Sequence, residues 1–302
     1  MRPALRSPHP AGSPTSGASP HEYRPRPRRL AGPAVMAGSG LCNQTGAAVG
    51  ALAFPVLGPL GVVAVRQYVA ALVLCAVARP RLRRFTWRQW WPVLLLGGVF
   101  GTMNLSLYSA VDRIGLGLAV TLEFLGPLTI AMAASRRRLD VGCAVLAGAG
   151  VVVLMRPRPS ADYTGMALGL VAACCWASYI LLNRVVGRRV PGAQGAAAAA
   201  AVSALAFLPV GAAVALAHPP TAAAVLCAVT AGVLSSAVPY LADLLTLRRV
   251  PARTFGLFMS VNPVLAAMVG RVVLGQRLGT VEWAAIGAVV VANAVSIARA
   301  ER

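Results

Sequence analysis

The sequence predicts an all-α membrane protein with ten transmembrane helices, arranged as two inverted repeats of five helices. Three observations predict this fold: apolar runs long enough to cross a bilayer, arginines gathered in alternate breaks between those runs, and local similarity between the two halves. The chain of 302 residues is 58% hydrophobic and 12% charged, and its mean hydropathy is +0.71. This composition excludes an ordinary soluble domain and favours a polytopic helical membrane protein.

The expected spans follow from the apolar runs, because about 20 consecutive apolar residues cross the hydrocarbon core of a bilayer. We expect spans at residues 34–54, 58–78, 91–110, 115–134, 139–155, 165–182, 195–216, 222–244, 255–274 and 281–297. Residues 1–33 are rich in Pro, Ser, Gly and Arg and show no apolar period, so we expect a disordered cytosolic tail there. Met36 is an alternative start of the chain.

The basic residues give the orientation of the spans. All 28 are arginines, and the formal net charge is +20. Twenty-two lie in the N-terminal tail, after the last span, or in the second, fourth, sixth and eighth breaks, whereas four lie in the remaining breaks. Because basic residues are retained on the cytoplasmic side, both termini are predicted to be cytoplasmic. The charge therefore reflects topology and does not indicate a nucleic-acid partner.

Two short sequence similarities between the halves indicate an internal repeat. The stretch LYSAVDRIGLGLAV, which leads into the fourth span, parallels LLTLRRVPARTFGLFM, which leads into the ninth; SRRRLD and LGQRLG follow the same two spans. With five helices per half, the second half enters the membrane from the opposite side. The repeats, at residues 34–160 and 161–298, are therefore inverted, and secondary transporters of this construction place their site where the halves meet near the midplane.

Two ionisable residues inside apolar spans indicate a polar route through the membrane. Glu123 in the fourth span and Arg66 in the second each lie about eight residues from the outer end of their span, or roughly 12 Å deep. A carboxylate at the bilayer centre costs roughly 2.5–3.5 kcal/mol on the insertion scale, so it usually faces the protein interior. Two interpretations stay open. The pair is either a structural clamp or a site where Glu123 binds a proton or an amine, with Arg66 holding the ionised acid or meeting a substrate carboxylate.

Prolines accompany polar residues in both halves. Pro127 cannot donate its helix hydrogen bond, which frees a carbonyl near Glu123, so Gly126 and Pro127 are predicted to form a hinge or a broken turn. In the ninth span Pro263 follows Asn262 and marks a second hinge. Inverted symmetry places Asn262, a further candidate site residue, in the inner half of the membrane, opposite in depth to Glu123.

Further residues within the spans complete the expected substrate and proton site. Asp243 is a second candidate carboxylate, with an ordinary interfacial role as the alternative, and Trp176 lies deep enough to line a cavity. The expected hydrogen-bonding partners of a polar substrate are Asn104, Tyr108, Tyr179 and Tyr240. The expected anchors at the membrane interface are Trp87, Trp90, Trp91 and Trp283.

No enzymatic activity, cofactor or metal is expected. The sequence contains no Walker loop, HExxH or GxSxG motif, and its six cysteines lie in predicted spans without histidines at metal-ligand spacing. Because no cytosolic domain could hold a nucleotide, transport is expected to draw on a gradient.

Several stretches are similar to a known family over residues 42–297. They are QTGAAVGALAFPVLGPLGVVAVRQYVAALVLCAVARPRLRRF, LEFLGPL followed by SRRRLD, CCWASYILLNR, and SSAVPYLADLLTLRRVPARTFGLFMSVNPVLAA. They resemble the EamA branch of the drug/metabolite transporter superfamily, and within it the bacterial inner-membrane exporters of threonine and homoserine. The resemblance implies a ten-helix inverted-repeat transporter with both termini inside, exporting small metabolites by proton antiport.

The resemblance also carries over residue by residue. The positions that match its pattern are Arg66, Glu123, Pro127, Asp243, Thr254 and Pro263. Two positions depart from it: Asn262 replaces a glutamate before the second-half proline, and Gln276 replaces the glutamate of an LGE signature. Both departures remove a titratable group, so the resemblance concentrates proton binding on Glu123 and Asp243.

We therefore expect a bacterial inner-membrane exporter of amino acids or similar small zwitterions, driven by inward proton movement. Its partners would be the small-molecule substrate, protons and the lipid bilayer, and a homodimer is left open. One alternative is efflux of drugs or other metabolites by the same superfamily, which an aromatic cavity would favour. The other is a non-transporting scaffold or sensor, in which Arg66 and Glu123 would pair without a water-accessible cavity.

Overall fold

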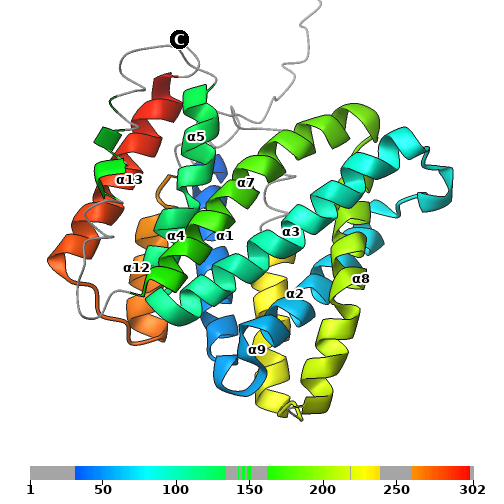
Figure 1. The fold of residues 1–302 in the computed structure, drawn as a ribbon, viewed down its shortest axis with the longest axis horizontal. Coiled ribbons are helices and arrows are strands. Elements are labelled where there is room, and N and C mark those ends of the chain that lie inside the picture. The colour runs from blue at the N-terminus through cyan, green and yellow to red at the C-terminus, as the bar shows by residue number, and fades with distance from the viewer. Residues whose placement is uncertain are drawn as a thin grey trace, which may run out of the picture.

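The computed structural model is described for residues 31–133, 142, 145, 146, 148–150, 162–217, 219–238 and 260–299, and the regular structure in these ranges is helical (Figure 1). The first half contains α1 (Ala31–Ala51), α2 (Phe54–Ala78), the short 3-10 helix η1 (Leu82–Arg84), α3 (Trp87–Ile114), α4 (Leu116–Glu123) and α5 (Leu125–Ala133). The second half contains α7 (Tyr163–Arg189), α8 (Gln194–Ala217), α9 (Ala222–Gly232), the π-helical turn η2 (Val233–Ala237), α12 (Asn262–Val273) and α13 (Thr280–Arg299).

The helices follow the predicted spans, with two differences in detail. The predicted fourth span is divided into α4 and α5, and the predicted eighth span passes from α9 into a π-helical turn. The predicted tail at 1–33, the fifth span at 139–155, and the chain between the π-helical turn and α12 lie wholly or mostly outside the described residues.

The connection between α2 and α3 shows how local sequence ends one helix and begins the next. Arg79 adopts a left-handed conformation with φ 43°, and its amide donates to the carbonyl of Cys75, which closes the last turn of α2. The 3-10 turn follows, and Thr86 and Gln89 then form a reciprocal capping box at the start of α3. This arginine-bearing connection is therefore ordered against both helices.

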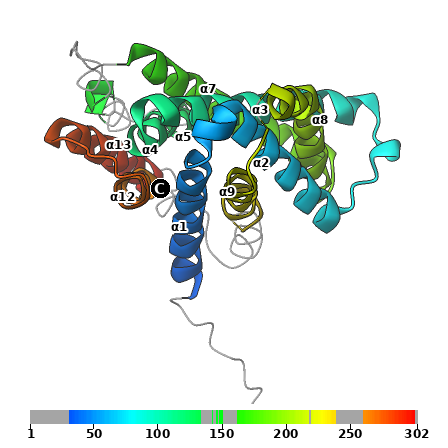
Figure 2. The same ribbon diagram turned by 90° about the horizontal axis from the view of Figure 1, so that it is seen from below.

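The two halves pack on each other rather than side by side as separate bundles. In Figure 1, α3 and α7 run together across the middle of the molecule, and α2 lies along α8. Seen from below, α1 stands between α9 and α12 (Figure 2). Helix α4 contacts α7 and α12, α3 also contacts α8, and α2 also contacts α9. Each of these helices thus has its main partners in the other half of the chain.

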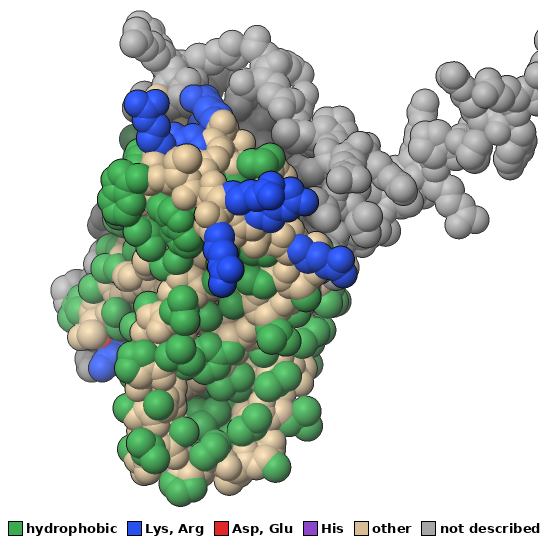
Figure 3. Space-filling model, turned by 90° about the vertical axis from the view of Figure 1, so that its right-hand side faces the viewer, with side chains coloured by type: hydrophobic (Ala, Val, Ile, Leu, Met, Phe, Trp, Pro, Cys, Tyr) green, Lys and Arg blue, Asp and Glu red, His purple; other side chains and the backbone are tan. Residues whose placement is uncertain are grey.

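The outer surface of the bundle is apolar. Leu72, Leu216 and Val272 are 75%, 86% and 82% exposed, and Figure 3 shows hydrophobic side chains spread over one face below a group of arginines. Among the described residues, α2, α3, α7 and α8 are long and apolar enough to cross a membrane, and shorter apolar helices accompany them. Exposed apolar surface of this extent is suited to lipid rather than water, so the chain is a multi-pass membrane protein.

Candidate functional site

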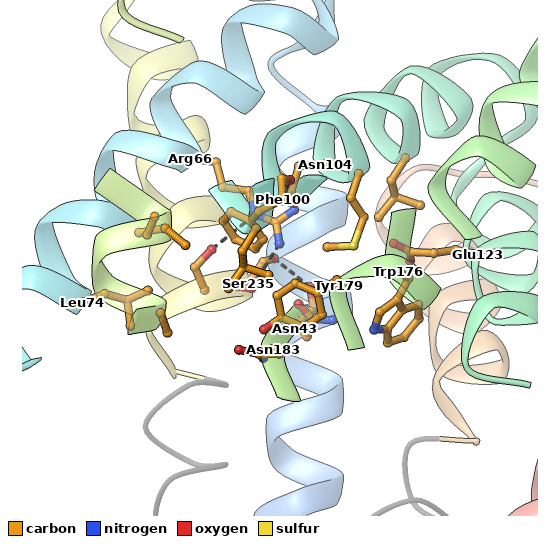
Figure 4. A pocket seen from close by; sticks show the side chains of 18 residues that line it. Asn43, Arg66, Leu74, Phe100, Asn104, Glu123, Trp176, Tyr179, Asn183 and Ser235 are labelled. Carbon is orange, nitrogen blue, oxygen red and sulfur yellow. Dashed lines mark hydrogen bonds between the residues drawn. The ribbon is translucent and has the colours of Figure 1, made fainter. Parts of the chain in front are cut away.

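A buried cavity of about 260 Å³ lies where the two halves meet. Helices α1, α2, α3, α4, α7 and α8 and the π-helical turn all contribute to its wall (Figure 4). The polar residues that line it are Asn43, Arg66, Asn104, Glu123, Tyr179, Asn183, Ser235 and Ser236. In a bundle whose exterior is apolar, such a concentration of polar side chains indicates an interior site for a polar molecule.

Arg66 is held in the wall of this cavity by the second half of the chain. Its Nε donates to the hydroxyl of Ser236 at 3.3 Å and its Nη2 to the carbonyl of Ser235 at 3.1 Å. The π-helical turn that carries both serines is a geometry found frequently at functional sites. Because a guanidinium has five N–H donors in a rigid fork, these two bonds orient it and leave other donors for a ligand.

Tyr108 supports Arg66 from behind. The guanidinium carbon of Arg66 lies 5.1 Å from the centre of the Tyr108 ring, an electrostatically favourable cation–π arrangement. The ring is 1% exposed and meets Phe54 edge to face. Its hydroxyl has no hydrogen-bond partner among the described residues, and Tyr108 is not among the residues that line the cavity. Tyr108, predicted to contact the substrate, thus lies against Arg66 and outside the lining of the first cavity.

Glu123, the last residue of α4, faces the same cavity (Figure 4). It is 7% exposed, and within the described part of the chain its carboxylate accepts no hydrogen bond. Trp176 lines the cavity beside it and packs edge to face on Phe124, with the ring centres 4.6 Å apart. A carboxylate so enclosed, without donors from these residues, is available to a proton or to a cationic group that enters the cavity.

The direct ion pair that equal depth would permit does not form. Among the described residues the ion pair is between Arg113 and Asp162, whose atoms are 3.0 Å apart. Arg66 and Glu123 instead line one cavity without a salt-bridge contact. The arrangement differs from a structural clamp, because both charged groups point into a shared space.

A second cavity of about 190 Å³ adjoins the first. Both are lined by Arg66, Glu123 and Trp176, and the second extends to Gln44 and Asn262. There Gln44 donates from Nε2 to Oδ1 of Asn262 at 3.4 Å. Asn262, predicted as a site residue, thus lies in this adjoining space rather than in the first cavity.

The predicted hinge residues lie beside a helix break in one half and at a helix start in the other. The helix is broken at Phe124, between α4 and α5, where Pro127 provides no donor for the carbonyl of Glu123. A Cβ added to Gly126 would collide with the carbonyl oxygen of Ala173, so glycine permits the close contact of α5 with α7. Pro263 occupies the first turn of α12, a position where proline is favoured.

The cavity extends toward the end of the bundle that carries most of the described arginines. Leu74 lies five residues before Arg79 on α2, and Asn183 lies five residues before Arg188 on α7. Toward the opposite end, a cluster of fully buried apolar side chains fills the space between the helices; its members include Val62, Val63, Ala110, Leu116 and Ala119.

The structure brings together five of the predicted site residues in the first cavity: Arg66, Asn104, Glu123, Trp176 and Tyr179. Tyr240 and Asp243 lie outside the described residues. Sequence reasoning missed Asn43, Asn183, Ser235 and Ser236. The polar run CNQT within the first span and the adjacent serines in the eighth were available signals, but which helix faces they occupy depends on tertiary packing.

Gln276 has a structural role. Its Oε1 accepts a hydrogen bond from the amide of Leu116 at 2.9 Å, which caps the start of α4 beside the turn at Gly115, where φ is 83°. An amide oxygen and a carboxylate oxygen both accept such a bond. The departure from the LGE signature therefore preserves an acceptor, although it removes a titratable group.

A polar cavity enclosed by membrane-spanning helices of both halves defines the class of the protein, a multi-pass membrane transporter. The comparisons with known proteins give its family. Residues 163–298 match the EamA-like transporter family. The chain is 37% identical over 256 residues to the threonine/homoserine exporter RhtA of Escherichia coli K12, covering 83% of this chain and 85% of that protein. The chain belongs to the EamA-like transporter family, and it is a transporter rather than an enzyme.

A second relative and a solved structure agree with this assignment. The threonine/homoserine exporter RhtA of Salmonella typhimurium SL1344 is 38% identical over 259 residues, with 83% of this chain and 85% of that protein covered. A protein of known crystal structure, 22% identical, superposes with a TM-score of 0.52 over 85% of this chain and 95% of its own. The latter likeness supports the fold alone.

Proposed function

We propose that this protein exports threonine, homoserine or similar small neutral amino acids from a bacterial cell, in exchange for protons that move inward. The observation that carries the proposal is that Arg66 and Glu123 face one cavity without pairing. An amino-acid zwitterion supplies the complement to both, because its carboxylate suits the Arg66 fork and its ammonium group suits the Glu123 carboxylate. The exporter function of the relatives named above supports this reading.

Proton coupling would follow from competition for one carboxylate. Glu123 is the acidic side chain that lines the cavity among the described residues. If a proton and the substrate ammonium group use the same oxygens, binding of one displaces the other. Protonation from the outside would then release substrate outward, and deprotonation toward the cytosol would allow the next molecule to bind.

The side chain of the substrate would occupy the apolar end of the cavity. In Figure 4, Leu74 lies at the opposite side of the cavity from Glu123. Small residues of α8 line the wall at the arginine-bearing end: Ala196, Ala199 and Ala200. Asn183 and Tyr179 line the same cavity and offer hydrogen-bonding groups to a substrate hydroxyl. A short side chain, apolar or bearing one hydroxyl, fits this lining.

The arginine bias supports an inner-membrane orientation with both termini in the cytoplasm. In that orientation the part of the cavity lined by Leu74 and Asn183 lies on the cytosolic side, from which an exporter takes up its substrate.

The helix contacts support two inverted repeats, at residues 34–160 and 161–298. If the halves are related, α1 corresponds to α7, α2 to α8, α3 to α9 and α4 to α12. Under this correspondence the α3–α7 contact becomes α9–α1, and the α3–α8 contact becomes α9–α2; both of these contacts are observed. The same correspondence converts α4–α7 into α12–α1 and leaves the α2–α8 and α4–α12 contacts unchanged. Such an exchange of contacts is expected for related halves. The break beside Pro127 and the start of α12 beside Pro263 would then be the hinges of the two halves.

Neither alternative function has comparable support. Three aromatic residues line the first cavity, but eight of its 18 lining residues are polar, whereas pockets for drug-sized ligands are lined predominantly by hydrophobic and aromatic side chains. A non-transporting scaffold would require Arg66 and Glu123 to pair in dry packing, whereas both line a cavity.

The test is uptake of labelled amino acids into inside-out vesicles under an imposed proton gradient. Wild-type protein should accumulate threonine or homoserine only with the gradient, and Glu123→Gln should abolish that accumulation while inserting normally. Arg277→Gln, an exposed arginine distant from the cavity, is the control and should transport as wild type. Gradient-driven accumulation that survives in Glu123→Gln would refute the assignment.

A further inference from the structure

One end of the bundle carries a strong positive charge that the transport site does not use. Eight exposed arginines lie on the α2–α3 connection, at the start of α3 and in the last turns of α7. They are Arg79, Arg81, Arg83, Arg84, Arg88, Arg184, Arg188 and Arg189. Figure 3 shows arginines gathered at this end of the molecule, directly above an apolar face.

No acidic side chain near these arginines in the sequence balances their charge. Residues 67–111 and 163–242 contain no aspartate or glutamate. Within the described part of the chain, none of the eight forms an ion pair, since the salt bridge found there joins Arg113 to Asp162. A surplus of this size attracts an anion from outside the chain.

Part of this surface is preorganised around a hollow lined by Thr86, Arg88, Gln89, Trp91 and Arg189. The guanidinium carbon of Arg189 lies 4.8 Å from the centre of the Trp91 ring, and its Nη1 donates to the carbonyl of Arg88 at 2.9 Å. Gln89 donates in turn to the carbonyl of Arg189 at 2.8 Å. Stacking and one hydrogen bond fix the plane of the guanidinium and leave its other N–H groups for a ligand.

The apolar surface beside the hollow indicates what kind of anion binds. On α3, Trp87 is 73% exposed, Leu94 is 41% exposed and Leu95 is 53% exposed. They continue from the arginine-bearing end along the outside of the helix, where acyl chains would lie. A free anion would use the arginines alone, whereas a phospholipid would use both surfaces.

We propose that the hollow between Arg88 and Arg189 binds the phosphate of an anionic phospholipid, with its acyl chains along the exposed face of α3. Arg88 belongs to the first half of the chain and Arg189 to the second, so the bound phosphate bridges the halves. It would reinforce a link already made by Gln89 to Arg189 and by the amide of Arg81, which donates to Oε1 of Gln194 at 3.1 Å. The lipid therefore stabilises the observed packing of α3 on α7.

The experiment uses the full chain in a neutral detergent, with phosphatidylglycerol or phosphatidylcholine added at equal amounts. Lipid retained by the protein is counted by native mass spectrometry, and the midpoint of thermal unfolding is recorded in parallel. Phosphatidylglycerol should be retained at least fivefold better than phosphatidylcholine and should raise the midpoint, because a ligand of the folded state stabilises it.

Two variants test the location. Arg88→Gln with Arg189→Gln should remove most of the preference for phosphatidylglycerol. Arg271→Gln with Arg277→Gln, which removes the same charge from exposed positions elsewhere, should keep it. Arg88→Gln alone leaves the stacked Arg189 intact and should still lower retention severalfold, which keeps the test valid if the double variant does not fold.

Three results would overturn the proposal. Equal retention of the two lipids would exclude an anionic headgroup site, and an equal loss in the control pair would show only a general effect of charge. An equal rise in the unfolding midpoint with inorganic phosphate, at the same concentration and without lipid, would assign the hollow to a free anion. None of these outcomes depends on the transported substrate.

Discussion

Two arginine–carboxylate couples, Arg113 with Asp162 and Arg66 with Glu123, differ in whether their charged groups are in contact. At the surface, where water could solvate both charges, Arg113 and Asp162 are in contact at 3.0 Å. In the interior, where separated charges are costly, Arg66 and Glu123 share a cavity without contact. The surface couple has its partners within the chain. The function proposed above gives the interior couple a third partner, the substrate, and this difference would distinguish a structural contact from a binding site.

Replacement of the two arginines by lysine gives the largest difference between the couples. Arg66→Lys keeps the charge but cannot bond both Ser236 and Ser235, stack on Tyr108 and still present a fork to a carboxylate. Loss of a charged hydrogen bond worth about 1.5–3 kcal/mol should raise the half-saturating substrate concentration about tenfold to a hundredfold. Gradient-driven amino-acid uptake in vesicles measures it.

Arg113→Lys is the matched control, because lysine can retain the single bond to Asp162. Its uptake should stay within about twofold of wild type, since an exposed pair contributes little. Comparable losses in the two variants would remove the distinction between the couples.

The sequence predicted that Arg66 and Glu123 lie inside the bundle, but it did not predict the hydrogen bonds that hold Arg66. Hydropathy gave the spans, and equal depth indicated that Arg66 and Glu123 could approach each other. It did not indicate that Arg66 would bond instead to Ser235 and Ser236. Those contacts depend on a π-helical turn and on how α2 faces that turn, and neither is encoded in hydrophobic periodicity.

At some positions the sequence does not show which of two uses a side chain has. Tyr108 was expected to bind a polar substrate, but its ring lies beneath Arg66. Gln276 lacks the titratable group of the signature glutamate, and its oxygen caps α4. Residue type alone does not tell whether an acceptor is used for its charge or for its lone pairs.

Bulk added at the apolar end of the cavity sharpens the comparison, because it changes the space and leaves both charges in place. Ala196 is partly exposed and lines the cavity from the first turn of α8. Ala196→Leu should reduce transport of amino acids with larger side chains about tenfold more than transport of the smallest, as pocket discrimination of roughly 1–3 kcal/mol allows. Competition between labelled and unlabelled amino acids in the vesicle assay measures the ratio.

Ala196→Ser is the control for this change, since it adds little volume and should leave the ratio unchanged. A uniform loss of all substrates in Ala196→Leu would place the substrate side chain elsewhere in the cavity.

The smallest effect is expected at the surface couple, and it concerns stability rather than transport. The amide of Gly165, which donates to Asp162 at 2.8 Å, and the guanidinium of Arg113 hold the pKa of the Asp162 carboxyl below its ordinary value. Because the pKa is lower in the folded state, the ionised carboxylate stabilises the fold at pH above the ordinary aspartate range. That stabilisation is lost as the pH falls through the folded-state pKa.

Asp162→Asn removes the charge but retains an oxygen that can cap α7. At neutral pH its unfolding midpoint in detergent should be slightly below that of the wild type, and the two curves should converge on acidification. Uptake at neutral pH should be unchanged. A difference that grew toward acidic pH would contradict the lowered folded-state pKa of Asp162. If Asp162→Asn lost transport while remaining folded, the surface couple would share the role proposed for Glu123 and Arg66, and direct contact would no longer separate a structural couple from a binding couple.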